Sequence, residues 1–143
     1  MNTRRNGGFT LIELVVVIAL LGILAAFAIP RFASLEREAR IATVQGLSGS
    51  VRSASTMAHA LFIATGATPV NMEGASINIT NGYPDANDIA NTLADTSGFA
   101  VTVNGPGTEA TIAKTGVASG CEVVYTEAAA GNVPTIVVDT SGC

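Results

Sequence analysis

The sequence predicts an α+β fold in which a long N-terminal helix packs on a four-stranded antiparallel sheet. Residues 9–65 hold a continuous apolar run and then apolar residues spaced three or four apart, which is typical of helices. Four short alternating segments follow between residues 99 and 139, with no helical pattern between them. The 143 residues are enough for one modest domain and a long helix, but not for two cores.

The apolar run from Phe9 to Ile29 predicts a membrane span over residues 9–30. A helix of this length is about 30 Å long, the thickness of the hydrocarbon core of a bilayer. Thr10 and Glu13 are its polar residues, and no Lys or Arg lies between Phe9 and Pro30. A charged side chain at the centre of a span costs about 2.5–3.5 kcal/mol, and less near its edge. Glu13 therefore needs a partner, unless the segment is an ordinary anchor with a chance acid near one end.

The eight residues before the span form a short basic leader that ends in Gly7 and Gly8. In a secretory signal the small residues follow the apolar stretch, whereas here they precede it. A cut after Gly8 would release residues 1–8 and leave the span attached to residues 31–143. The same cut would make Phe9 the new N-terminus, with its amine four residues before Glu13.

Two residues weaken the predicted helix, Gly22 and Pro30. Proline inside a helix removes one backbone hydrogen bond and costs about 3 kcal/mol, so we expect a kink near residues 26–30.

Beyond Pro30 the sequence predicts an amphipathic helix that ends near Thr65 and Gly66, where glycine supplies a left-handed cap. Its expected buried stripe consists of Phe32, Leu35, Ala39, Ala42, Leu47, Val51, Ala54, Ala58 and Leu61. Small residues recur from Gly46 to Ser55, and such residues let helices approach closely. The stripe packs on the chain's own sheet or on other helices, and we expect both on different faces.

Residues 67–86 predict a loop region with one short strand around Ile77–Ile79. Tyr83 to Leu93 predicts a turn that opens a short helix, with Asp85 as its cap and with Ile89 and Leu93 packed inward. The oxygens of Asp85, Asn87 and Asp88 could instead begin a calcium site, but the full spacing of a calcium-binding loop is missing. The predicted strands are residues 99–103, 110–114, 121–126 and 135–139.

The basic leader predicts a cytoplasmic N-terminus. Arg31 follows the span directly, and its charge mildly favours the opposite orientation. Cys121 and Cys143 then lie in an oxidising compartment and are expected to form a disulfide. Its closed loop of roughly twenty residues is worth about 3 kcal/mol in chain entropy. Two free, buried cysteines are the alternative.

The sequence gives no support for a catalytic, metal or cofactor site. It has no phosphate-binding loop, dinucleotide fingerprint or cluster of Cys and His with metal spacing. His59 is the single histidine, so we expect a surface or half-buried structural residue rather than a catalytic group. The formal charge of −4 and the lack of a basic stripe argue against nucleic acid as a partner.

The leader, the sequence Gly8-Phe9-Thr10-Leu11-Ile12-Glu13 and the span resemble the precursors of type IV pilins and pseudopilins. The resemblance implies that a membrane prepilin peptidase and N-methyltransferase cuts between Gly8 and Phe9 and methylates Phe9. It implies that Glu13 pairs with the Phe9 ammonium of an adjacent subunit, and that residues 22–30 lose helix in the filament. A C-terminal loop closed by cysteines would be displayed on the filament surface.

The implied function is that of a structural subunit of a type IV pilus. Its partners would be inner-membrane lipid, an assembly platform and identical subunits in a helical filament. Gly82-Tyr83-Pro84 and the C-terminal cysteines are similar to mannose-sensitive haemagglutinin pilins, which implies adhesion, with motility or DNA uptake as alternatives. A type II secretion pseudopilin is the second interpretation, although its major form usually lacks such a disulfide. A membrane-anchored periplasmic binding module is the third, and it predicts that Glu13 is dispensable.

Overall fold

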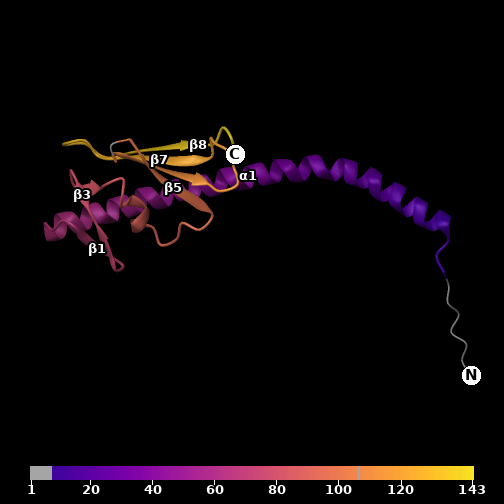
Figure 1. The fold of residues 1–143 in the computed structure, drawn as a ribbon, viewed down its shortest axis with the longest axis horizontal. Helices are drawn as coiled ribbons and strands as arrows, with labels where there is room; N and C mark the ends of the chain where they lie inside the picture. Colours follow the sequence, from indigo (N-terminus) through magenta and orange to yellow (C-terminus); the bar gives the residue numbers. More distant parts are fainter. Residues whose placement is uncertain (1–7, 106) are drawn as a thin grey trace, which may run out of the picture. The chain divides into compact units, whose positions relative to one another are not determined.

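The computed structural model describes residues 8–105 and 107–143, and the side chains of residues 29–33 lie outside that description. The chain divides into two compact units, Met1–Arg37 and Glu38–Cys143. The first consists mainly of the start of helix α1, whereas the second contains the end of α1 and all strands. The expected α+β class is confirmed (Figure 1).

Helix α1 (Leu11–Thr65) is assigned as one continuous helix of 55 residues. It ends as predicted: the Gly66 amide donates to the Phe62 carbonyl at 2.8 Å. Gly66 adopts a φ of 64°, which only glycine reaches without strain. The helix assignment continues through Gly22 and Pro30, so a loss of helix there stays a prediction about the assembled state.

The buried face of α1 within the second unit differs in part from the predicted stripe. Its buried residues are Val44, Leu47, Val51, Ser55 and Ala58. Ala39 and Ala42 are exposed, so they do not pack on the chain's own sheet, and their packing on other helices stays a prediction. Leu35, in the first unit, is exposed as well, and Phe32 lies outside the described side chains. The sequence pattern misleads here because the helix has a core face and a second face of small residues, and Ala fits both.

Two short hairpins and a 3₁₀ turn follow α1. Strands β1 (Val70–Met72) and β2 (Ala75–Ile77) pair antiparallel, as do β3 (Ile79–Thr80) and β4 (Tyr83–Pro84). A small core of Ala58, Val70, Met72 and Ile77 joins the first hairpin to the last turns of α1. The predicted short helix is the 3₁₀ turn η1 (Ile89–Thr92), where Ile89 is buried and Leu93 packs against the main core.

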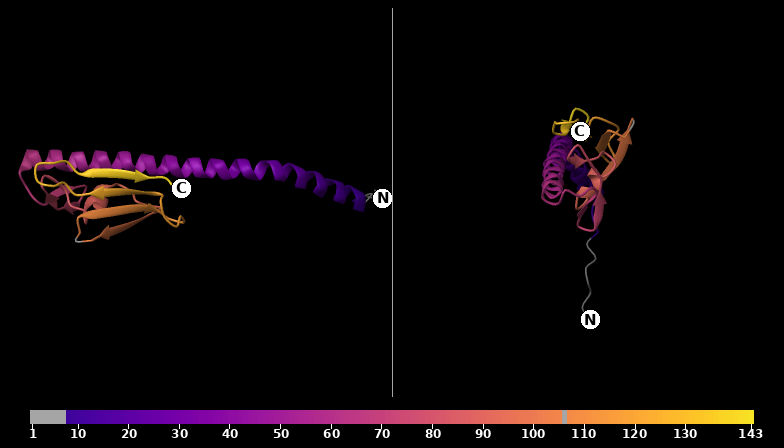
Figure 2. Two further views of the ribbon diagram at one scale, coloured as in Figure 1. Left: turned by 90° about the horizontal axis from the view of Figure 1, so that it is seen from above. Right: turned by 90° about the vertical axis from the view of Figure 1, so that its left-hand side faces the viewer.

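The four predicted strands are confirmed as one antiparallel sheet in the order β5-β6-β7-β8. They are β5 (Phe99–Asn104), β6 (Glu109–Lys114), β7 (Glu122–Thr126) and β8 (Thr135–Asp139). Residues that lie opposite each other on neighbouring strands point to the same face of the sheet. The pairs Ala110↔Tyr125 and Ile112↔Val123 of β6 and β7 are fully buried. The views in Figure 2 show this sheet on one side of α1, and Val44, Leu47 and Val51 complete its core.

The predicted disulfide joins Cys121, before β7, to Cys143 beyond β8. The two segments that meet are Ser-Gly-Cys at 119–121 and Ser-Gly-Cys at 141–143. The Gly142 amide donates to the Gly120 carbonyl at 2.7 Å, and a Cβ on Gly142 would overlap the Ser119 carbonyl oxygen. Glycine is therefore required for this close approach.

Candidate functional site

The start of α1 brings Thr10 and Glu13 together. Gly8, Phe9 and Thr10 precede the helix and are exposed, with Phe9 91% exposed. The Thr10 carbonyl accepts the first helical hydrogen bond, from the Leu14 amide at 3.3 Å. Thr10 is therefore the residue that caps the helix.

Thr10 and Glu13 form a reciprocal capping box. The Glu13 amide donates to Thr10 Oγ1 at 3.3 Å, which satisfies one amide of the first turn. In return, Glu13 Oε2 accepts from the Thr10 amide at 2.8 Å and from the Thr10 hydroxyl at 2.9 Å. A threonine followed three residues later by glutamate is the known sequence signature of this arrangement. Thr10 is thus a partner of Glu13 that was not predicted from the sequence, where a cation was the expected partner.

The segment behind the box is apolar and uncovered. Among the described residues, Leu11–Ala28 is the one segment long and apolar enough to cross a membrane, judged by length and composition. None of these side chains is buried within the chain. Such a surface is stable only in lipid or against other protein.

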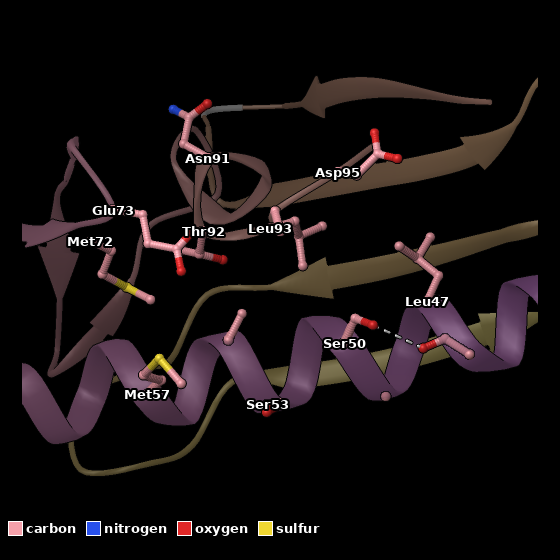
Figure 3. Close-up of a pocket in the computed structure, with 14 residues that line it drawn as sticks. Leu47, Ser50, Ser53, Met57, Met72, Glu73, Asn91, Thr92, Leu93 and Asp95 are labelled. Carbon is pink, nitrogen blue, oxygen red and sulfur yellow. Dashed lines mark hydrogen bonds between the residues drawn. The ribbon is translucent and has the colours of Figure 1, made fainter. Parts of the chain in front are cut away.

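The second unit also leaves one face of α1 uncovered, next to a groove of about 700 Å³ (Figure 3). The small residues Gly46, Gly49 and Ser53 and the exposed Met57 form its helical side. Met72 and Glu73 of the first hairpin and Leu93 to Asp95 form its opposite side. The ionisable residues that line it are the carboxylates Glu73 and Asp95, which do not form a nucleophile and base pair.

The remaining polar residues singled out in the sequence serve the packing of the loop region. His59 stacks on Tyr83 with ring centroids 4.1 Å apart, and its Nδ1 lies 2.6 Å from the Gly82 carbonyl oxygen. Asp85 Oδ1 accepts from the Asp88 amide at 2.8 Å in the turn before η1. The N-cap of η1 is Asp88, so the prediction that Asp85 caps the short helix is wrong. Asp88 is itself used by Asn78 and Asn91. Within the described residues no group of three or more His, Cys, Asp or Glu could hold a metal ion.

Comparisons with known proteins point in one direction. The family model for the prokaryotic N-terminal methylation motif matches residues 3–29. The major component of a narrow type IV pilus from Thermus thermophilus, PilA5, is 50% identical over 54 residues, 38% of this chain and 47% of that protein. The fimbrial protein EcpC from Eikenella corrodens is 31% identical over 115 residues, 80% of this chain and 68% of that protein. The chain belongs to the type IV pilin family.

The family match is strongest at the N-terminus. The type II secretion system core protein G from Pseudomonas aeruginosa is 44% identical over 46 residues, 32% of this chain and 32% of that protein. The matched segment spans less than half of PilA5. No solved structure matches this pilin. The relatives of this chain thus include a type II secretion protein as well as pilins.

Proposed function

We propose that this pilin is the precursor of a structural subunit of a type IV pilus. The proposal rests on the order and spacing of four features along the chain. They are a basic leader, Gly8-Phe9, Glu13 and an apolar helix that the chain itself leaves uncovered. An ordinary anchor requires only the last of these. A subunit that moves from a membrane into a filament requires all four.

Processing divides the chain into three parts. Prepilin peptidase cuts between Gly8 and Phe9, removes residues 1–8 and methylates the Phe9 amine. Residues 9–30 then serve as the inner-membrane span and later as filament core, and residues 31–143 form the periplasmic head. The N-terminus is cytoplasmic before assembly, because Arg4 and Arg5 precede the span.

Assembly joins identical subunits through α1, with the help of an inner-membrane platform. The Glu13 carboxylate of one subunit pairs with the Phe9 ammonium of its neighbour, which resolves the cost of an acid within the span. The uncovered small residues of α1, Ala42, Gly46, Gly49 and Ser53, allow neighbouring helices to approach closely. Gly22 and Pro30 are the positions where the helix opens in the filament.

The assembled product is an extracellular pilus that serves adhesion, with motility as a further role. The Cys121–Cys143 loop is presented at its surface. The chain is a substrate of an enzyme and not an enzyme itself, and it needs no cofactor or metal.

The first experiment tests processing. Gly8→Ala should leave the leader attached, which mass spectrometry detects as the added mass of residues 1–8 and the absence of an N-methylated Phe9. A normal Phe9 start in this variant would refute the proposed cleavage site.

The second experiment tests assembly. Glu13→Ala should still be processed and inserted in the membrane, because removing a charge favours insertion, yet it should give few filaments by electron microscopy. Abundant filaments like those of the unchanged protein would refute the pairing role of Glu13. A membrane-anchored binding module instead predicts that Glu13 is dispensable and that neither protein forms filaments.

A type II secretion pseudopilin is the second candidate, favoured by the match to core protein G. The disulfide counts against it. The two roles differ in location, since a pseudopilin stays in the periplasm whereas a pilus is sheared from the cell surface.

A further inference from the structure

Strand β5 lies at one edge of the sheet, and its middle is uncovered on both faces. In the described chain, the order β5-β6-β7-β8 leaves β5 with a neighbour on one side only. Residues 100–103 are exposed, although Val101 and Val103 point to the same face as their buried partners on β6, Ile112 and Ala110. Two valines on the core-facing side of the sheet are therefore each 39% exposed.

The backbone groups along this edge are open. The Thr115 amide donates to the Gly98 carbonyl at 3.0 Å, so Gly98 faces the β6 side. Successive residues of a strand direct their backbone groups to alternate sides, so Val101 and Val103 direct their amides and carbonyls away from β6. Within the described residues, no hydrogen bond from outside the sheet engages these four groups. The edge can therefore accept a further strand.

Strand β5 has none of the features that protect an open edge. Natural edge strands are kept apart by charged residues, proline, bulges or a short length. All six residues of β5 pair with β6 without a bulge, and its sequence Phe-Ala-Val-Thr-Val-Asn contains no charge and no proline. The other edge strand, β8, is shorter and ends in Asp139. An unprotected edge of this kind predicts a partner strand.

The two ends of β5 carry opposite charges, which are supplied by β6. At one end, Lys114 Nζ lies 5.3 Å from the centre of the Phe99 ring. At the other end, Glu109 Oε1 accepts from the side-chain amide of Asn104 at 3.3 Å. Antiparallel pairing of two β5 strands brings the positive end of each beside the negative end of the other, whereas parallel pairing brings like charges together. A second copy of the chain therefore complements this edge.

We propose that β5 pairs antiparallel with β5 of a second copy of this chain, across a two-fold axis through Thr102. This register places Val101 of each copy opposite Val103 of the other, so all the open amides and carbonyls find partners. It also gathers the four half-exposed valines on one face, because residues that lie opposite each other share a face. The two Thr102 side chains meet on the other face, and such threonine pairs stabilise a sheet.

The pairing joins subunits that point in opposite directions. The two-fold axis reverses the direction of β5, and in the second unit the strands run alongside α1 (Figure 2). Subunits of one filament all point the same way, because a filament grows by a contact that repeats without closing. The β5 contact therefore lies between two antiparallel filaments. One contact is small and weak, but it repeats along both filaments, and repetition strengthens the association.

Cysteine cross-linking of the full-length protein in detergent micelles tests the pairing without relying on the proposed pilus function. Thr102→Cys places two thiols on the axis, where the Cα atoms are about 4.5 Å apart, a distance that a disulfide spans. Oxidation should give a species of twice the subunit mass on a non-reducing gel. Val137→Cys, at an exposed valine of β8, is the matched control and should stay monomeric. No dimer from Thr102→Cys, or equal dimer from both variants, would overturn the proposal.

Two further variants test the register and the edge. Ala100→Cys should not cross-link, because its thiols would be about 13 Å apart along the paired strands. Adding Val101→Lys to Thr102→Cys should abolish the dimer, since an edge lysine opposes strand pairing, whereas adding Val137→Lys should not. A dimer that survives Val101→Lys would contradict the pairing. In the unchanged protein, the Val101 and Val103 amides should exchange their hydrogens more slowly as concentration rises, and an unaltered rate would also overturn it.

Sheared filaments test where the contact lies. Val101→Lys should form filaments in normal number but lose the side-by-side pairs seen with the unchanged protein in electron micrographs. Loss of the filaments themselves, or unpaired filaments in both proteins, would contradict a contact between filaments. A cross-link from Thr102→Cys to a different protein in the cell would assign the edge to another partner and overturn the proposal. Failure of the Gly8→Ala or Glu13→Ala experiments leaves the micelle result unaffected, so the two failures are distinguishable.

Discussion

Tyr125 is the residue that ties the loop region to the sheet. Its side chain is fully buried, and its hydroxyl donates to the Pro84 carbonyl at 2.7 Å. Burial raises the pKa of Tyr125 to about 12, a shift that the Ser55 hydroxyl of α1 opposes and the nearby Glu127 carboxylate reinforces. The phenol of Tyr125 therefore links β7 to β4.

The raised pKa predicts an alkaline loss of stability. The unfolded chain releases the phenolic proton near pH 10, whereas the folded chain keeps it to about pH 12. The folded state binds more protons in this window, so the free energy of unfolding falls as pH rises, by about 2–3 kcal/mol between pH 10 and 12. Below pH 10 this contribution is fully present. Denaturant unfolding at a series of pH values measures the slope.

Tyr125→Phe identifies the source of that slope. The variant should lose about 1–2 kcal/mol at neutral pH, because the buried Pro84 carbonyl loses its donor. Above pH 10 its stability should fall less steeply than that of the unchanged protein. Equal slopes in the variant and in the unchanged protein would contradict the role of Tyr125.

Asp85 combines a favourable turn bond with an unfavourable charge. Burial raises the pKa of the Asp85 carboxyl, while the hydrogen bond that this carboxyl accepts from the Asp88 amide lowers the pKa. The folded state then binds the proton more tightly than the unfolded state, so the charge costs stability above the usual pKa and the cost fades as pH falls.

Two substitutions separate these effects. Asp85→Asn keeps an acceptor for the Asp88 amide and removes the charge, so it should be neutral or stabilising by less than about 1 kcal/mol at pH 7. Its advantage should shrink toward pH 3. Asp85→Ala loses the acceptor as well as the charge, so it should cost about 1 kcal/mol at pH 7. The cost should grow toward pH 3, where the unchanged protein no longer carries the unfavourable charge. An Asn variant as unstable as the Ala variant would show that the charge itself is needed.

At the scale of elements, the sequence predicts best where a periodic pattern is long enough to count. The four strands of the sheet alternate over five or six residues, and all four lie where predicted. Strands β1 to β4 have two or three residues, too few for a pattern, and only the region of Ile77–Ile79 was expected to hold one.

The residues of the candidate site were predictable from the sequence. The leader, Gly8-Phe9 and Glu13 follow from the linear order of charges and small residues. The bonds from Thr10 to Glu13 were predictable too, because a threonine followed three residues later by glutamate before an apolar run is the signature of a capping box. The faces of α1 depend instead on which side the sheet covers, which separates Val44 and Leu47 from the exposed Ala39 and Ala42.

The Cys121–Cys143 disulfide is expected to stabilise the head, and its removal tests this contribution. Cys121 and Cys143 are buried and 22 residues apart in the sequence. The Cys121→Ser, Cys143→Ser double variant should lose about 3 kcal/mol, because the unfolded chain regains the freedom of a roughly twenty-residue loop. Denaturant unfolding measures the loss, and thiol titration of the denatured, non-reduced protein should find no free thiol. Two reactive thiols would rule out the bond in the purified protein.

At the scale of the whole molecule, assembly has to bring acidic copies together. Without Arg4 and Arg5 the chain has five basic and eleven acidic residues, a formal charge of −6 before the new amine is counted. Like-charged heads repel at low ionic strength. The uncovered small-residue face of α1 is nearly uncharged between Ala42 and Ala60, with Arg52 as its cation. Contacts between helices on this face therefore avoid most of the repulsion.

Gly49 tests this face without disturbing the fold of the single chain. A Cβ at Gly49 would meet no atom within 4 Å, so Gly49→Ala and Gly49→Leu should both keep or raise monomer stability, by about 0.5–1 kcal/mol. If neighbouring helices pack closely here, Gly49→Ala should still assemble, whereas the larger side chain of Gly49→Leu should hold the helices apart and lower filament yield. Thermal unfolding of the monomer and electron microscopy of sheared pili give the two readouts. A leucine variant that is stable and forms filaments in normal number would place the subunit contacts on another face of α1, and the small residues would then need a different explanation.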